Sequence, residues 1–150
     1  MTKVKGDDSL PWREMSRYDG PQSSPGFVLW HGFMRWQRHL NALLKPFGLT
    51  QPQFAVLATC GWLTRGGQEV TQQAMADFLD MDRMHISQIA SRLERDGLLC
   101  RSPSVEDMRA KLVSLTPAGR EKLAEVMPVA EAFDESFFAG AAPDRTSFRF

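Results

Sequence analysis

Residues 71–116 constrain the fold of this chain most, because their pattern predicts two short helices followed by a β-hairpin. The second helix begins after Asp82, a favourable N-cap residue, and ends before Gly97, where a C′ glycine would stop it. Between these two residues, four apolar side chains recur at helical spacing and form one stripe. They are Ile86, Ile89, Ala90 and Leu93. A helix–turn–helix with a hairpin behind it can place one helix in a DNA groove and a loop beside it.

The opposite face of this second helix is rich in hydrogen-bond donors and nearly free of acidic residues. It carries Met84, Gln88, Ser91 and Arg95, flanked by His85, Ser87 and Arg92. This composition suits a helix that reads DNA, but it is also typical of the solvated face of an ordinary amphipathic helix.

The residues after Gly97 predict the hairpin. Residues 98–101 form a short strand candidate, and residues 111–115 alternate polar and apolar side chains with period two. The segment that joins them, residues 102–110, is polar and turn-forming. Directly behind a recognition helix, such a hairpin is a wing.

Several short motifs between residues 49 and 119 carry a family resemblance. They are Leu49-Thr50, Gln53-Phe54, Val56-Leu57, Thr71-Gln72, Asp82-Arg83, Leu93-Glu94, Gly97-Leu98, Asp107-x-Arg109-Ala110-Lys111 and Leu115-Thr116-Pro117-x-Gly119. On these motifs, roughly residues 27–135 resemble the MarR family of bacterial winged-helix transcription regulators. Two positions depart from the family's pattern: Met108 stands where a second Arg is common, and Gln88 where an Arg often stands. Both departures weaken the basic character of the predicted DNA-binding surface.

The resemblance implies a mainly α (α+β) fold, a winged helix–turn–helix with long N- and C-terminal dimerisation helices. We expect a flexible N-terminal arm over residues 1–25 and a single MarR-type domain over residues 26–150. Within it, residues 27–47 and 117–139 are the expected dimerisation helices, and residues 71–116 the winged-helix DNA-binding unit.

Capping residues outline the other helices of this domain. Thr50 begins a capping box for a central helix over residues 54–63, which is apolar nearly all round. Thr71 caps the first helix of the DNA-binding pair, and Thr116 followed by Pro117 opens the last long helix. The first helix of the pair is expected to bury Met75, Phe78 and Leu79.

Charge is distributed unevenly between the two expected dimerisation helices. Residues 27–47 contain Arg35, Arg38 and Lys45 but no acid, whereas residues 121–135 contain five acids against Lys122 alone. Opposite charges of this kind can pair across the two-fold axis of a homodimer. The same asymmetry is compatible with a simple solvated surface, since surface ion pairs contribute little.

Composition limits the other classes of function. The chain has a formal net charge of +0, which argues against a blanket nucleic-acid binder. It has neither an apolar run of the ~18 residues that a membrane span needs nor a signal-peptide core near its N-terminus. Cys60 falls in an apolar helix and Cys100 in a strand, so both are expected to be buried and reduced. Together these features predict a cytoplasmic protein with no membrane partner.

Candidate DNA contacts follow from helix-end and base-edge chemistry. The helix start at Thr71, Gln72 and Gln73 would meet backbone phosphate, and Gln88 can read adenine. Arg109 is the candidate for minor-groove insertion, and Asp107 would hold it there by a charge-assisted bond as wing support. The full predicted DNA-binding set is Thr71, Gln72, Gln73, Arg83, Met84, His85, Ser87, Gln88, Ser91, Arg92, Arg95, Arg109 and Lys111.

The resemblance also implies release of DNA by a small aromatic or anionic effector. Candidate effector residues are Trp30, His31, Met34, Arg35 and Trp62, although aromatic residues at helical spacing also suit a plain core. The reactive Cys of redox-sensing family members is absent from the first helix. The sequence has no metal-binding His pair, phosphate-cradling Gly-rich loop or nucleophile elbow, so neither an enzyme nor a cofactor or metal is expected.

We therefore predict a sequence-specific DNA-binding transcriptional repressor that binds an inverted-repeat operator as a homodimer. The alternative is a winged-helix adaptor that uses its recognition helix against protein and does not bind DNA.

Overall fold

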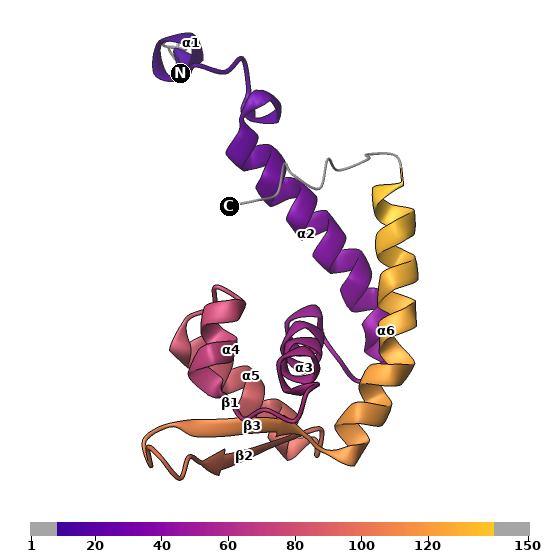
Figure 1. The fold of residues 1–150 in the computed structure, drawn as a ribbon. Helices are drawn as coiled ribbons and strands as arrows, with labels where there is room; N and C mark the ends of the chain where they lie inside the picture. Colours follow the sequence, from indigo (N-terminus) through magenta and orange to yellow (C-terminus); the bar gives the residue numbers. More distant parts are fainter. Residues whose placement is uncertain (1–8, 140–150) are drawn as a thin grey trace, which may run out of the picture. The chain divides into compact units, whose positions relative to one another are not determined.

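This computed structural model describes residues 9–139, which form a mostly helical chain with one small antiparallel sheet (Figure 1). The elements in order are α1 (Trp12–Met15), η1 (Pro21–Ser23), α2 (Pro25–Leu44), η2 (Lys45–Phe47), α3 (Gln51–Thr64), β1 (Val70–Thr71), α4 (Gln72–Phe78), α5 (Arg83–Arg95), β2 (Leu99–Pro103), β3 (Lys111–Leu115) and α6 (Pro117–Phe138). The predicted fold class, a mainly helical winged helix–turn–helix, is confirmed, and its two long helices are α2 and α6.

The chain divides into two units, Met1–Gln37 and Arg38–Phe150. In the first unit, α1 and η1 lie where the sequence predicted only an arm, and the Trp12 indole N–H donates to the Tyr18 carbonyl at 2.9 Å. The first half of α2 exposes a run of large apolar side chains. They are Phe27, Val28, Leu29, Trp30, Phe33 and Met34.

In the second unit, α3 is the central helix. It packs against α4, α5, α6 and the sheet, and Val56, Leu57 and Cys60 are fully buried. Burial raises the pKa of the Cys60 thiol to about 11, so this cysteine stays protonated at neutral pH. The predicted apolar stripe of α5 is also confirmed, since Ile86, Ile89, Ala90 and Leu93 are all buried. These contacts fix α5 with its polar face outward.

The sheet has the strand order β1–β3–β2 with antiparallel pairs (Figure 1). In the hairpin, Leu99 pairs with Leu115, and Pro103 with Lys111, which confirms the predicted wing. The strand β1 was not predicted: its two residues pair with Val113 and Leu112 and lead directly into α4. The start of α4 is therefore hydrogen-bonded to the same sheet that carries the wing.

The predicted helix starts are confirmed by side-chain caps. Thr71 accepts the Ala74 N–H at 3.1 Å, and Asp82 accepts the His85 N–H at 2.8 Å. Thr50 forms the predicted capping box. At the other junction, the Thr116 hydroxyl accepts the Gly119 N–H at 3.0 Å and donates to the Gly97 carbonyl at 2.6 Å. Thr116 thus ties the end of the recognition helix to the start of α6.

Two predicted burial states are wrong. Phe78 is 58% exposed, because the inward face of α4 runs through Met75 and Ala76 and leaves the last residue of the helix outside. Cys100 is exposed, because side chains alternate along β2 and Leu99 is the buried one. Leu79 is half-buried.

Candidate nucleic-acid interface

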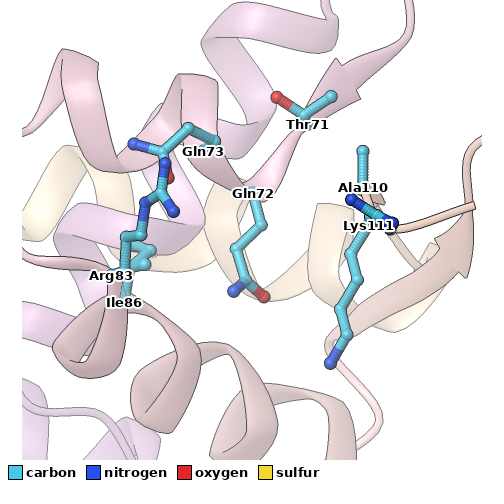
Figure 2. Close-up of a pocket in the computed structure, with 8 residues that line it drawn as sticks. Thr71, Gln72, Gln73, Arg83, Ile86, Ala110 and Lys111 are labelled. Atoms are coloured by element: carbon cyan, nitrogen blue, oxygen red, sulfur yellow. The ribbon is translucent and has the colours of Figure 1, made fainter. Parts of the chain in front are cut away.

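One surface cleft joins the start of α4, the start of α5 and the base of the wing. It measures about 240 Å³ and is lined by Thr71, Gln72, Gln73, Arg83, Ile86, Arg109, Ala110 and Lys111. Figure 2 shows Gln72 between Arg83 on α5 and Lys111 on β3. We call this 240 Å³ cleft the α4–wing cleft. It brings together six predicted DNA-binding residues from three segments of the chain.

The two glutamines at the start of α4 already have protein partners. The Gln73 amide donates to an Asp77 carboxylate oxygen at 2.7 Å, and the Gln72 Oε1 accepts from the Arg101 guanidinium at 3.3 Å. These two side chains can therefore offer a ligand only the polar atoms that are not used in these two hydrogen bonds.

A second cleft lies along the outer face of α5. It measures about 490 Å³ and is lined by Ser87, Gln88, Ser91, Glu94, Arg95 and Arg101. We call it the α5-face cleft. Met84 is 72% exposed at the start of the same helix, so a large apolar side chain projects from it. Arg92 is paired with Asp96 at 3.1 Å, whereas Arg95 forms no ion pair within residues 9–139.

The wing is shaped by hydrogen bonds from short polar side chains. The buried Ser104 hydroxyl accepts the N–H groups of Glu106 and Asp107, at 3.3 and 3.4 Å. The Asp107 carboxylate accepts the backbone N–H of Arg109 at 3.0 Å, so the predicted support of Arg109 acts on its main chain and leaves the guanidinium available. Met108 is 76% exposed beside it, which places an apolar side chain at the end of the wing.

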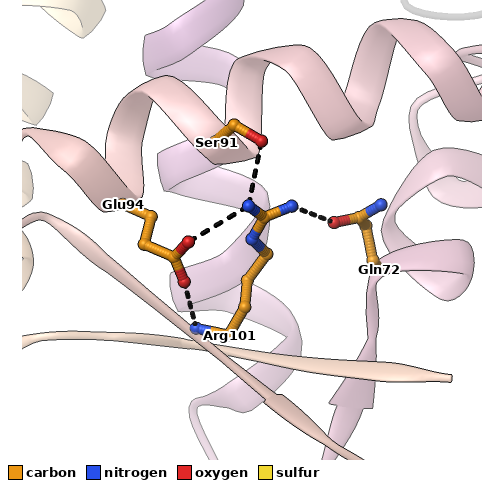
Figure 3. A network of polar contacts seen from close by, with 4 residues as sticks. All are labelled: Gln72, Ser91, Glu94 and Arg101. Carbon is orange, nitrogen blue, oxygen red and sulfur yellow. Dashed lines mark hydrogen bonds and ion pairs between the residues drawn. The ribbon is translucent and has the colours of Figure 1, made fainter.

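A hydrogen-bond network around Arg101 links the α4–wing cleft to the α5-face cleft (Figure 3). Arg101, the centre of this network, was not among the predicted site residues. The Arg101 guanidinium bonds to Gln72, Ser91 and Glu94, and the Arg101 backbone N–H donates to Glu94 at 3.1 Å. This pairing with Arg101 lowers the pKa of the Glu94 carboxyl. Side chains alternate along a strand, so Arg101 lies on the same side of β2 as the buried Leu99. This alternation is the sequence signal that could have predicted an internal position for Arg101.

Comparison with known proteins identifies the family. Residues 49–111 match the MarR family model. The chain is 39% identical over 126 residues to the HTH-type transcriptional regulator YdcH of Bacillus subtilis strain 168, covering 84% of this chain and 86% of that protein. The chain belongs to the MarR family. It is therefore a helix–turn–helix transcriptional regulator, and this membership supports the expectation that it is not an enzyme.

Solved MarR-type structures share the fold. BpsR of Bordetella bronchiseptica is 26% identical with a TM-score of 0.74, over 88% of this chain and 91% of that one. MepR of S. aureus, solved in a complex with DNA, is 18% identical with a TM-score of 0.74, over 83% and 89% of the two chains, and this likeness concerns the fold alone.

The predicted effector residues of this MarR-family chain fall in both units. Trp30, His31, Met34 and Arg35 lie on α2 in the first unit, where His31 stacks on Phe27 with ring centroids 5.9 Å apart. Trp62 lies on α3 in the second unit and is exposed, with the Arg65 guanidinium 3.5 Å above its ring.

The second unit has a further cleft, of about 450 Å³, between α3, β3 and α6. Arg65 and Arg120 are among the residues that line it. Within residues 9–139, no group of three or more His, Cys, Asp or Glu side chains is arranged to hold a metal ion. No helix in this part of the chain is long and apolar enough to span a membrane.

Proposed function

We propose that this MarR-family regulator represses transcription by binding an inverted-repeat operator as a homodimer. The observation that carries the proposal is the α4–wing cleft, which gathers polar and cationic groups from α4, α5 and the wing on one surface. A duplex presents phosphates on both sides of a groove, so a surface of this kind can hold the backbone while α5 enters the major groove.

Each segment has a separate task in this proposal. Arg83 and Lys111, together with the start of α4, contact phosphates and fix the position of the protein. Gln88, on the outer face of α5, contacts a base edge in the major groove. Arg109 enters the minor groove beside it, where a narrow A·T-rich groove concentrates negative potential.

The homodimer is supported by the exposed apolar surface of α2. Val28 is 54% exposed and Trp30 is 59% exposed, and contiguous apolar patches of this kind commonly mark protein interfaces. Arg35 and Arg38 on α2 and the acidic residues of α6 offer charge complementarity for such a contact. Sedimentation at micromolar concentration tests this part, since an intact monomer would contradict it.

Release by a small aromatic or anionic effector is a separate part of the proposal. It is supported by BpsR, whose DNA binding is regulated by 6-hydroxynicotinic acid. Trp30, His31, Met34, Arg35 and Trp62 remain the proposed effector residues. A cytoplasmic location is proposed on the same family grounds.

Duplex binding is tested by fluorescence anisotropy on fragments from the DNA upstream of the chain's own coding region, as a function of salt. Each neutralised phosphate contributes about −0.9 to the slope of log affinity against log salt. Arg83, Arg95, Arg109 and Lys111 form no ion pair within residues 9–139, so a dimer with all of them on phosphates would reach a slope of about −7.

The adaptor function is favoured by one observation, the exposure of two large apolar side chains, Met84 on α5 and Met108 in the wing. A folded dimer that binds none of the upstream duplexes at low salt would support that function. Binding that weakens as salt rises would support the regulator.

A further inference from the structure

Arg101 makes side-chain contacts to both helices of the helix–turn–helix from its place on the wing strand β2. Its Nη2 donates to the Ser91 Oγ at 2.9 Å and to the Glu94 Oε1 at 3.1 Å, and its Nη1 donates to the Gln72 Oε1 at 3.3 Å (Figure 3). Gln72 opens α4, whereas Ser91 and Glu94 lie on α5. One guanidinium thus joins three separate elements.

The side chain of Arg101 is held in this position by its surroundings. It is only 13% exposed, and its buried Nε–H has no partner among the described residues. A guanidinium is planar and presents its donors in a fixed fork, so contacts in three directions define its orientation. The orientation of α5 relative to β2 is then defined as well, because Glu94 also accepts the Arg101 backbone N–H.

The same contacts neutralise an acid on the predicted DNA-binding surface. Glu94 is 40% exposed, and it lines the α5-face cleft together with Gln88 and Arg95. Glu94 and Arg101 also line a cleft of about 260 Å³ beside the wing, together with Arg109 and Lys111. Without a cation beside it, a carboxylate between these groups would repel phosphate.

We propose that Arg101 is a positioning residue for DNA binding, which fixes α5 against the wing and neutralises Glu94. In this role, the Ser91 hydroxyl and the Gln72 Oε1 bind Arg101 rather than DNA, so two of the predicted DNA contacts, Ser91 on α5 and the phosphate contact of Gln72, become internal ones. The inference rests on the proposed function, because its consequence is the affinity for a duplex.

The decisive experiment compares Arg101→Gln, Glu94→Gln and the double variant by anisotropy on the duplex that wild type binds. Arg101→Gln leaves the Glu94 carboxylate without its cation, so we expect affinity to fall at least tenfold. The double variant removes that carboxylate and should recover the part of the loss that its charge causes. Arg101→Lys keeps the charge without the fork, so it should lie between wild type and Arg101→Gln.

The salt dependence distinguishes positioning from direct contact. If Arg101 positions α5, the slope of log affinity against log salt in the double variant stays close to that of wild type. If Arg101 itself binds phosphate, the double variant stays as weak as Arg101→Gln and its slope becomes shallower by about one contact per protomer, which would overturn the inference. Thermal unfolding of each variant excludes loss of fold as the cause.

Two serines on the same face provide a matched pair. Ser91→Ala removes a hydrogen-bond partner of Arg101 and should weaken binding to the same extent at every operator sequence. Ser87→Ala changes a serine without an Arg101 contact, so it should leave the hydrogen bonds of Arg101 intact. A change of base preference in Ser91→Ala would contradict the internal role. If folded wild type binds no duplex, the proposed function fails and this role fails with it. If wild type binds but the double variant is not rescued, only the role of Arg101 fails.

Discussion

Arg109→Ala is the sharpest test of the wing. Arg109 lines both the α4–wing cleft and the cleft beside the wing, and it forms no ion pair within residues 9–139. The loop conformation depends on the bond from the Arg109 backbone N–H to Asp107, which alanine retains. The substitution therefore removes a charge from the surface while leaving the wing in place.

The expected change in the salt slope follows from the presence of two wings in a dimer. One cation lost from each protomer of a dimer removes about two phosphate-proximal charges, and each contributes about −0.9 to the salt slope, so the slope should become shallower by about 1.8. Between 50 and 200 mM salt, the affinity of wild type should fall by a factor about 12 times larger than that of the variant. The loss should affect nearly all sequences, and A·T-rich flanks most.

Anisotropy at several salt concentrations measures this slope directly. Arg120→Ala is the matched control, because it removes the same charge from an exposed arginine that lines the cleft between α3 and α6 instead. The control should keep the slope of wild type. If Arg109→Ala also keeps both affinity and slope while remaining folded and dimeric, the wing does not contact DNA and the reasoning is refuted.

Three further predictions concern single side chains. Gln88→Ala should cost about 1–3 kcal/mol at one base position and relax the preference there, measured with single-base operator variants, while equal losses on all variants would contradict base reading. Gly119→Ala should lower the free energy of unfolding by about 1–3 kcal/mol in a denaturant titration, because an added methyl group would overlap the backbone just before β2. Gly32→Ala on α2, where the methyl group meets nothing within its own protomer, should not lower the stability of the protomer. An alkylating reagent should label Cys100 quickly in the native protein and Cys60 only after unfolding, and rapid native labelling of both would contradict the buried thiol.

Local features of the sequence were enough to predict most of the second unit. A cap depends on residues three positions apart, so Thr71, Asp82 and Thr116 could be assigned without knowledge of the fold. The apolar stripe of α5 and the alternation in β3 are equally local patterns. These features define where α5 and the wing begin and end, and hence most of the candidate interface.

Features that depend on distant residues were missed. The strand β1 has two residues, and only its pairing with Val113 and Leu112 makes it a strand. The contact from Arg101 to Gln72 joins residues 29 positions apart, and no pattern within one element predicts it. Ser91 was predicted as a DNA contact from its helix face alone, because the guanidinium that occupies its hydroxyl comes from another element.

The charge of the interface depends on how its groups are paired rather than on their sum. Residues 82–111 contain six Arg or Lys and five Asp or Glu, which is close to neutral. Four of these acids are engaged within the fold: Asp82 and Asp107 accept backbone N–H groups, and Glu94 and Asp96 pair with arginines.

The cations are divided in a different way. Arg92 forms an ion pair with Asp96, and Arg101 forms one with Glu94. The other cations form no ion pair within residues 9–139; they are Arg83, Arg95, Arg109 and Lys111. An acid that is bonded to a cation or to N–H groups repels a phosphate less, because its charge is already compensated, while an unpaired cation keeps its full attraction. A chain with zero net charge can therefore present a surface that attracts DNA, and the loss of Arg101 would return one acid to that surface.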